Sequence, residues 1–488
     1  MRLLSIILHS MEYDYDDDHE EPNRQELDET LRRFREAVRS GNWQHGIPNA
    51  EALEAIVHYC LETIAFEDAR IFAKMWTEKA PYSTDAWHKY GIALGSLGRW
   101  QEALNAYVQA AKLDPIDIEI TVNRGIALEQ LGRLEDANKL IEDALDADPN
   151  NLDALFTKAL ILEKRERYDE AMRLFSYLAK QDLFQRDAMF EIAICHEALE
   201  QFNEALAIYE TLTDMDPFEP NAWFNKGVIY GKKGANRSGL KCYDMATVVK
   251  PDFVNAWYNM GNTYATLGRV QESVAAYTEA HRLDPADIPV MHNLASSLEE
   301  RGSFLEASEM FTKVIELDPQ HSQALYGRGT CADALEKYEE AIADYEAALK
   351  IEPAYADLWY AKADALFNLQ RISESLTAYR KALEIQPEDV ECWFDYSTSV
   401  LESGDVLEAL RGFNECMRLM PQWAEGYFAT AKTLCAAGQP LSSVPFLVKA
   451  FALDPSKRDD YEAEFPLIAG PLGMEYLNNV LKEHQQGE

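Results

Sequence analysis

The sequence predicts an all-α fold of antiparallel helix pairs stacked one after another. Three observations predict it: a proline returns every 34 positions, small residues return at two fixed places between the prolines, and large aromatic residues return at two others. A fixed period of roughly 20 to 50 residues is typical of repeat proteins. Proline suits the end of each period because it lacks an N–H and stops a helix.

The 488-residue chain begins with segments that lie outside the repeat. Residues 1–10 contain an apolar run too short to span a bilayer, and Met11 offers an alternative start. We expect residues 1–25 to form a disordered acidic tail. Residues 26–49 contain the helical pattern ELDETLRRFREAVR and are expected to form a capping helix.

The prolines set the register of twelve repeats over residues 50–457, which we expect to form one elongated domain. We number the repeats from residue 50 and the positions within each repeat from 1 to 34. Position 32 is proline in every repeat except the fourth, where it is Leu183, so the bend there is expected to differ. The prolines are Pro81, Pro115, Pro149, Pro217, Pro251, Pro285, Pro319, Pro353, Pro387, Pro421 and Pro455.

Repeat 7, residues 254–287, shows the physical logic of the unit. Trp257 and Gly261 fall on one face of a first helix. Gly268 follows, where a glycine accepts the left-handed conformation that ends a helix. Tyr277 marks the inner face of a second helix, and we expect the small Gly261 to let the two helices approach while large side chains fill the remaining space.

Residues 458–488 follow the last repeat and are expected to form capping helices. The helical patterns cover 458–464 and 474–484, and FPLIAGPLG separates them.

The order tryptophan, small, aromatic, alanine, aromatic, alanine and proline over 34 residues resembles the tetratricopeptide repeat. Repeats 6, 7, 9 and 10 fit best, whereas repeats 1, 4 and 12 depart from the pattern. The resemblance implies a right-handed superhelical α-solenoid. It also implies a concave side that the first helices line at positions 2, 5, 6, 9, 12 and 13.

Two sets of apolar residues are candidates for a partner-binding groove on that side. Position 5 is mostly aromatic and includes Phe156, Phe190, Phe224 and Tyr258. Position 9 is apolar in repeats 2 to 6 and polar beyond, and its apolar members include Ile126, Leu160, Ile194 and Val228. The alternative for both sets is packing between neighbouring helices.

Asparagines form a third candidate set. Asn225, Asn259 and Asn293 hold position 6 of three consecutive repeats, and Asn262 lies close by. A side-chain amide donates to and accepts from a peptide backbone at once, so such a row suits an extended polypeptide. It resembles the asparagine ladder in the superhelix of the O-linked N-acetylglucosamine transferases. The alternative is that asparagine is simply common at this position of the family.

The charge of the chain narrows the class of partner. Its 84 acidic and 46 basic residues give a formal net charge of −38. That charge repels phosphate backbones and anionic membrane surfaces, so neither nucleic acid nor membrane is an expected partner. Position 5 has no lysine and position 2 has no base, unlike carboxylate-clamp chaperone-tail binders in the family. An apolar and basic segment of a partner protein or peptide fits better.

The sequence indicates no catalytic or metal site. It has no HExxH, GxxxxGK[ST] or GxSxG motif, and we expect no cofactor. The seven cysteines are scattered without a CxxC pair, which favours a reducing, cytoplasmic compartment. We therefore expect a non-catalytic scaffold that grips an extended or helical partner segment in its concave groove. The alternative is an accessory subunit that recruits substrate to a separately encoded enzyme.

Overall fold

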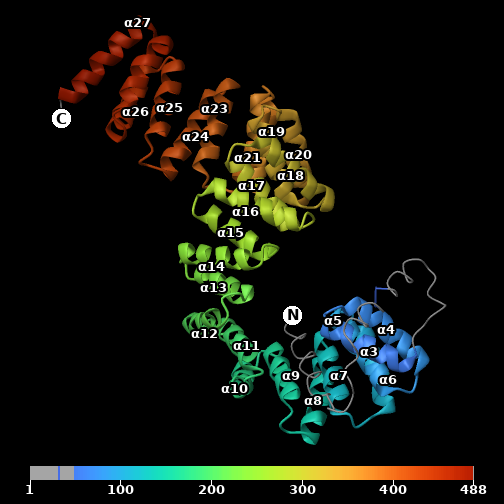
Figure 1. Ribbon diagram of the computed structural model, residues 1–488. Coiled ribbons are helices and arrows are strands. Elements are labelled where there is room, and N and C mark those ends of the chain that lie inside the picture. The colour runs from blue at the N-terminus through green and yellow to red at the C-terminus, as the bar shows by residue number, and fades with distance from the viewer. Residues whose placement is uncertain (1–30, 33–48, 487–488) are drawn as a thin grey trace. The chain divides into compact units, whose positions relative to one another are not determined.

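A computed structural model describes residues 31–32 and 49–486, and all regular secondary structure in them is α-helical (Figure 1). The chain divides into two compact units, Met1–Ala235 and Asn236–Glu488. The predicted acidic tail at 1–25 lies outside the described residues, as does almost all of the predicted capping helix at 26–49. The prediction of paired helices is confirmed over the repeats.

The N-terminal unit holds repeats 1 to 5 and the first helix of repeat 6. Its first helices are α3 (Ala50–Glu62), α5 (Thr84–Ser96), α7 (Ile118–Gln130), α9 (Leu152–Lys164), α11 (Gln185–Ala198) and α13 (Pro220–Lys232). Its second helices are α4 (Phe66–Lys79), α6 (Trp100–Leu113), α8 (Leu134–Ala147), α10 (Tyr168–Leu178) and α12 (Phe202–Met215). Each first helix packs against the second helix of its own repeat in repeats 1 to 5.

The C-terminal unit begins with α14 (Asn236–Val249), the second helix of repeat 6. Its first helices are α15 (Val254–Thr266), α17 (Ile288–Glu300), α19 (Ser322–Ala334), α21 (Ala356–Asn368), α23 (Val390–Glu402) and α25 (Ala424–Ala436). Its second helices are α16 (Val270–Leu283), α18 (Phe304–Leu317), α20 (Tyr338–Ile351), α22 (Ile372–Ile385), α24 (Val406–Leu419) and α26 (Pro440–Leu453).

The turn without proline differs from the others, as the sequence predicts. α10 has 11 residues and α11 has 14, whereas the other second and first helices have 14 and 13 residues. Phe184, directly after Leu183, is buried, and its ring centroid lies 5.7 Å from that of Phe156. The connection is irregular because an aromatic side chain turns inward where a proline turn would otherwise stand.

The two helices of a repeat approach closely where position 8 is glycine. A Cβ atom on Gly261 would lie 2.6 Å from the Cδ1 atom of Tyr277, so no larger side chain fits without a shift. Between these helices Gly268 adopts a φ of 66°, the left-handed conformation that the sequence predicts. Both predictions for repeat 7 are confirmed.

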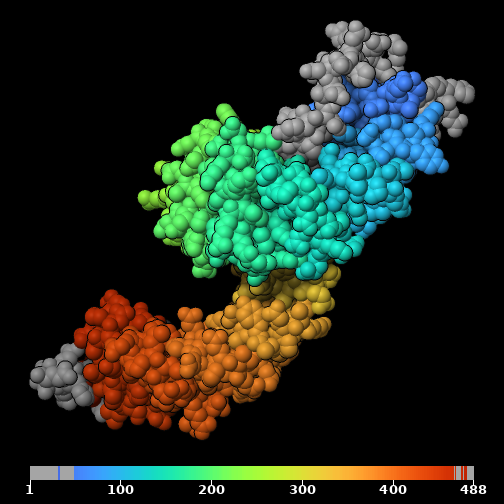
Figure 2. Space-filling model, turned by 90° about the horizontal axis from the view of Figure 1, so that it is seen from below, coloured from blue at the N-terminus to red at the C-terminus, as the bar shows by residue number. Residues whose placement is uncertain are grey.

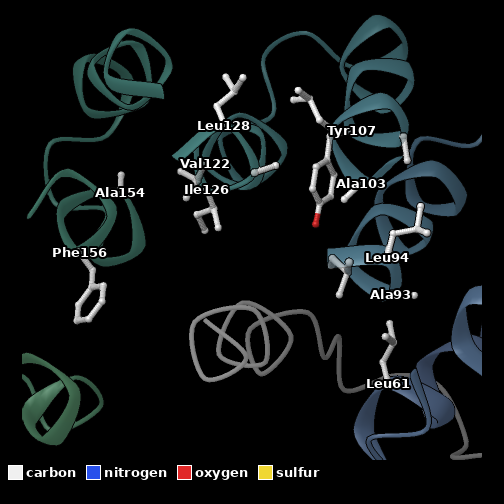
Figure 3. Close-up of a cluster of buried hydrophobic side chains, with 14 of the residues drawn as sticks. Leu61, Ala93, Leu94, Ala103, Tyr107, Val122, Ile126, Leu128, Ala154 and Phe156 are labelled. Carbon is white, nitrogen blue, oxygen red and sulfur yellow. The ribbon is translucent and has the colours of Figure 1, made fainter. Parts of the chain in front are cut away.

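Buried apolar side chains form clusters that run along each stack of helices. In the N-terminal unit, Tyr107 of α6 lies beside Ala103, and Ile126 of α7 is buried in the same cluster (Figure 3). On the face of the unit seen in Figure 2, side chains fill the spaces that separate the ribbons. Stacking therefore buries the apolar faces that a single repeat cannot bury alone.

One helical segment, α27 (Lys457–Gln486), follows repeat 12. The Tyr461 hydroxyl donates a hydrogen bond to Asn478 Oδ1 at 3.0 Å, yet a straight helix would separate residues 17 positions apart by about 26 Å. The segment therefore bends back on itself between them. The sequence predicts two helices here, and the structure has one helical segment that bends back on itself.

Candidate functional site on the first helices

The aromatic residues at position 5 pack within the protein. The rings of the candidates Phe156, Phe190 and Tyr258 each meet the position-24 ring of their own repeat. The Phe156–Phe175 centroids are 5.3 Å apart and the Phe190–Tyr209 centroids 5.4 Å apart. Tyr258 meets Tyr277 in the same way, at 5.9 Å. This ladder of aromatic pairs is a packing element.

Burial corrects part of the predicted groove. Phe156, Phe190 and Ile126 are buried, and Figure 3 labels Phe156 and Ile126 on their first helices. These three side chains cannot touch a partner in this structure, because 1–6% of each is exposed. They stabilise the first-helix face as buried packing residues.

The other five apolar candidates remain half-buried and so keep some surface. In the N-terminal unit these residues are Leu160, Ile194, Phe224 and Val228, and in the C-terminal unit the residue is Tyr258. Leu160 and Ile194 also pack against the core. The apolar part of the face is therefore smaller than the sequence predicts.

The asparagines join neighbouring helices. Asn225 Nδ2 donates to the Tyr209 hydroxyl at 3.0 Å in the N-terminal unit. In the C-terminal unit Asn293 Nδ2 donates to the Tyr258 hydroxyl at 3.1 Å and to Asn262 Oδ1 at 3.0 Å. Because Tyr258 and Asn293 are 35 positions apart, this contact links one repeat to the next.

Asn259 and Asn262 keep unused hydrogen-bonding groups. Both are half-buried on α15. Asn262 Oδ1 accepts from the Tyr277 hydroxyl at 2.6 Å as well as from Asn293. Among the described residues, no hydrogen bond uses the side-chain amide of Asn259 or the amide nitrogen of Asn262. Together with Asn293 they form what we call the amide cluster.

Sequence reasoning missed a row of carboxylates on the first helices of the C-terminal unit. Thr330 Oγ1 donates to Glu299 Oε1 at 2.6 Å, and the Tyr360 hydroxyl donates to Asp395 Oδ2 at 2.6 Å. The Tyr379 hydroxyl donates to Asp364. The signal that could have found this row is the recurrence of acids at positions 6, 9 and 12 in repeats 8 to 11.

These carboxyl groups hold their protons more tightly than usual. The pKa of Asp364 is raised to about 7, mainly by burial and to a smaller extent by the neighbouring Asp395 and Asp333, although the hydrogen bond from Tyr379 lowers it. Burial is also the main reason why the pKa of Asp395, of Asp333 and of Glu299 is raised. At neutral pH Asp364 therefore carries only part of a full negative charge.

Over residues 49–486 there is no group of three or more histidine, cysteine, aspartate or glutamate side chains that is able to hold a metal ion. None of the helices described there combines the length and apolarity needed to cross a membrane. All seven cysteines are free and buried.

Two family profiles, both described as tetratricopeptide repeat, match most of the chain. One matches residues 89–151, 122–184, 156–220, 190–236, 292–356, 332–390 and 360–415. The other matches residues 254–287. No curated protein matches the chain significantly.

Several solved structures resemble the chain over part or most of its length. The C-terminal part of a TPR repeat-containing protein from Cytophaga hutchinsonii is 19% identical, with a TM-score of 0.42, over 49% of this chain and 97% of that one. Cut9–Hcn1 from the APC/C hetero-tetramer is 16% identical, with a TM-score of 0.39, over 88% and 98%. YrrB, described as a TPR protein with an unusual peptide-binding site, is 25% identical, with a TM-score of 0.35, over 39% and 98%.

Proposed function

Because the chain belongs to the tetratricopeptide-repeat family, we propose that it is a non-catalytic scaffold that binds an extended segment of a partner protein on the face of its first helices. Within each unit, every repeat adds one first helix to this face, so the face grows with the number of repeats. A surface of this kind suits a long, thin ligand better than a compact one.

The amide cluster carries the proposal. An extended peptide offers an N–H and a C=O at every residue, and each needs a partner when water is displaced. Asn259 offers both a donor and an acceptor, and Asn262 Nδ2 offers a donor, on neighbouring turns of α15. Asn293 and Tyr277 already hold the Asn262 side chain in place, so Asn262 loses little conformational entropy when a peptide binds.

Charge and apolar surface indicate the chemistry of the partner. Position 2 is acidic in repeats 1 to 5, at Glu51, Asp85, Glu119, Asp153 and Asp187. Half-buried Leu160, Ile194 and Val228 add apolar surface in the N-terminal unit. We therefore propose that the first-helix face of the N-terminal unit binds apolar and basic side chains, and that the amide cluster of the C-terminal unit binds a peptide backbone.

A peptide selected against the full chain tests this proposal. Random 15-residue peptides are displayed, selected on the protein and resynthesised, and Kd is measured by fluorescence anisotropy. We expect Asn259→Ala to weaken binding about tenfold, which corresponds to one lost hydrogen bond of about 1.4 kcal/mol. Asn105→Ala, at an exposed asparagine on α6, is the matched control and leaves Kd unchanged.

Backbone N-methylation of the same peptide distinguishes binding of an extended backbone from binding of a helical peptide. If the amide cluster reads an extended backbone, methylation at the contacting residues removes donors and weakens binding at least tenfold. Binding that survives both methylation and Asn259→Ala contradicts the proposal. Binding that requires a helical peptide would instead favour a groove for an amphipathic helix.

A further inference from the structure

A small pocket lies between α5 and α6, the two helices of repeat 2. It has a volume of about 340 Å³, and Trp87, Tyr90, Glu102 and Gln109 are among the side chains that line it. The Trp87 and Tyr90 rings meet edge to face, with their centroids 6.4 Å apart. The pocket therefore combines aromatic surface with a carboxylate and an amide.

This pocket is not part of the first-helix face. Trp87 and Tyr90 hold positions 4 and 7 of their repeat. At 3.6 residues per turn, these positions lie on the opposite side of a helix from positions 2, 5, 6 and 9. A ligand in the pocket therefore leaves the first-helix face free for another segment.

Other repeats of this chain cover the equivalent tryptophan with a basic side chain. In repeat 6 the Lys226 ammonium lies 5.2 Å from the centre of the Trp223 ring, and in repeat 10 the Lys362 ammonium lies 5.6 Å from that of Trp359. Both lysines hold position 7, where repeat 2 has Tyr90. Each cation is attracted by the negative face of the ring below it.

Repeat 11 has the same three residue types as the pocket, and a cation lies against them. Trp393, Tyr396 and Glu408 hold positions 4, 7 and 19 of this repeat. The guanidinium carbon of Arg380, on α22, lies 5.7 Å from the centre of the Tyr396 ring, and Arg380 Nε donates to the Tyr396 hydroxyl at 3.1 Å. That hydroxyl donates in turn to Glu408 Oε1 at 3.2 Å. Tryptophan, tyrosine and glutamate at these positions therefore accommodate a guanidinium group.

In repeat 2 the described residues place no basic side chain over the Trp87 or Tyr90 ring. The residue that corresponds to Arg380 is Lys74, at position 25 of repeat 1, and it is exposed. The aromatic pair is nevertheless held in place, because Trp87 Nε1 donates to the Pro81 carbonyl at 3.0 Å. A ligand therefore meets a ring that is already ordered.

The acceptors beside the aromatic pair suit a guanidinium group. Glu102 accepts two hydrogen bonds from Arg99 at 2.8 Å, and its oxygens keep lone pairs for a further donor. Gln109 Oε1 is a second acceptor, 3.3 Å from Lys112 Nζ. A guanidinium group is planar and carries five N–H donors, so it can stack on a ring and donate to oxygens at its edge.

We propose that the pocket of repeat 2 binds an arginine side chain of a partner protein, with the guanidinium group against Trp87 and Tyr90 and hydrogen-bonded to Glu102. The net charge of −38 attracts a basic partner to the chain. The pocket then provides one specific anchor, which is independent of the amide cluster.

Fluorine NMR of the full chain tests this site. Tryptophan is replaced by 5-fluorotryptophan, and the Trp87 resonance is assigned by its loss in Trp87→Phe. The probe is a blocked glycine–arginine–glycine peptide, and the control ligand is the same peptide with citrulline, which has the shape of arginine without its charge. We expect the Trp87 resonance to shift saturably with the arginine peptide, with a Kd at least about fivefold lower than with the citrulline peptide.

Three variants locate the binding. Glu102→Gln removes the carboxylate and should weaken binding of the arginine peptide by at least about fivefold. Glu272→Gln, at the same position of repeat 7, removes a carboxylate that is likewise paired with an arginine, and should leave the Kd at Trp87 unchanged. Arg380→Ser removes the cation from repeat 11. The Trp393 resonance should not shift in the wild type and should respond to the arginine peptide in this variant.

Four results overturn the proposal. The first is a Trp87 resonance that does not move with the arginine peptide, and the second is an equal response to the citrulline peptide. The third is an unchanged Kd in Glu102→Gln. The fourth is a parallel shift of all tryptophan resonances, which indicates non-specific attraction to an acidic chain. Asn259→Ala leaves the Trp87 response intact, so failure here is distinct from failure of the amide cluster.

Discussion

Trp257 Nε1 donates a hydrogen bond to the carbonyl oxygen of Pro251, six positions earlier, at 3.0 Å. The same bond joins Trp87 to Pro81, Trp223 to Pro217, Trp359 to Pro353 and Trp393 to Pro387. Position 4 and position 32 therefore recur together in the sequence for one reason. The proline ends the second helix, and the indole of the next first helix ties down the carbonyl that the turn leaves free.

Replacing Trp257 with phenylalanine keeps a large ring and removes the donor. We expect Trp257→Phe to destabilise the turn between α14 and α15 by about 1 kcal/mol, the net value of one hydrogen bond. A repeat array does not necessarily unfold in one step, so the effect is read as faster amide hydrogen exchange in the peptides that cover this turn. Unchanged exchange there would show that the bond contributes nothing measurable.

Ile64 is strained, since its φ is 60° at the position where seven other repeats place glycine and four place glutamate or glutamine. A β-branched residue in the left-handed region costs about 1–2 kcal/mol, and its side chain is exposed, so little packing offsets that cost. We expect Ile64→Gly to stabilise repeat 1 by about 1 kcal/mol after the entropy of glycine is subtracted. Gly268→Ile is the mirror control and should destabilise repeat 7. The measurement is the melting temperature, which should rise for Ile64→Gly and fall for Gly268→Ile.

The parts of the fold that the sequence predicts correctly are local. Gly261 and Tyr277 meet within one repeat, so their spacing is enough to foresee the contact. Whether Phe156 is exposed or covered depends on Phe175 and Phe184, and helical periodicity alone cannot say that both rings close over it. The carboxylate row was missed for a related reason, because its members come from four successive repeats and only stacking brings them together.

Because Phe156 is buried, replacing it tests the stability of the protein and not the binding of a partner. Its ring is buried against Phe175 and Phe184, so Phe156→Ala leaves a cavity and should destabilise the N-terminal unit by about 3–5 kcal/mol. Loss of partner binding in this variant would then report unfolding rather than a lost contact. Phe224→Ala, at a half-buried ring, should cost less. Thermal melts followed by circular dichroism measure both, and a Phe156→Ala protein as stable as the wild type would refute the packing role.

His88 makes the N-terminal unit sensitive to acid. Burial, with help from Lys89, lowers the pKa of His88 to about 3, while its ring stays hydrogen-bonded to Asn123 and 3.7 Å from Glu119. The unfolded chain, with a histidine pKa near 6.5, binds the proton first, so stability is complete above about pH 6.5 and falls as pH drops. At pH 5 the loss is about 2 kcal/mol. His88→Gln keeps a hydrogen-bonding group and should flatten the pH dependence of amide exchange in α5 and α7.

Asp364 gives the C-terminal unit the opposite response. Its pKa is raised from 3.8 to about 7, mainly by burial, so the folded state holds a proton that the unfolded state releases. Stability from this group is therefore complete below about pH 4 and is lost as pH rises through pH 7. Asp364→Asn still accepts from the Tyr379 hydroxyl but has no charge to desolvate. We expect it to stabilise repeats 10 and 11 at pH 8 by on the order of 2 kcal/mol and to change little at pH 4.

The matched control for Asp364→Asn is Asp357→Asn, at an acid in the first turn of the same helix α21. It removes the same charge without removing a buried carboxylate, so it should lack the pH-dependent gain. Amide exchange in the peptides of α21 and α23, compared at pH 4 and pH 8, separates the two variants. Equal protection of wild type and Asp364→Asn at pH 8 would mean that the carboxylate is already well solvated when charged, and the row would then lie open to solvent and present its full negative charge to a basic partner.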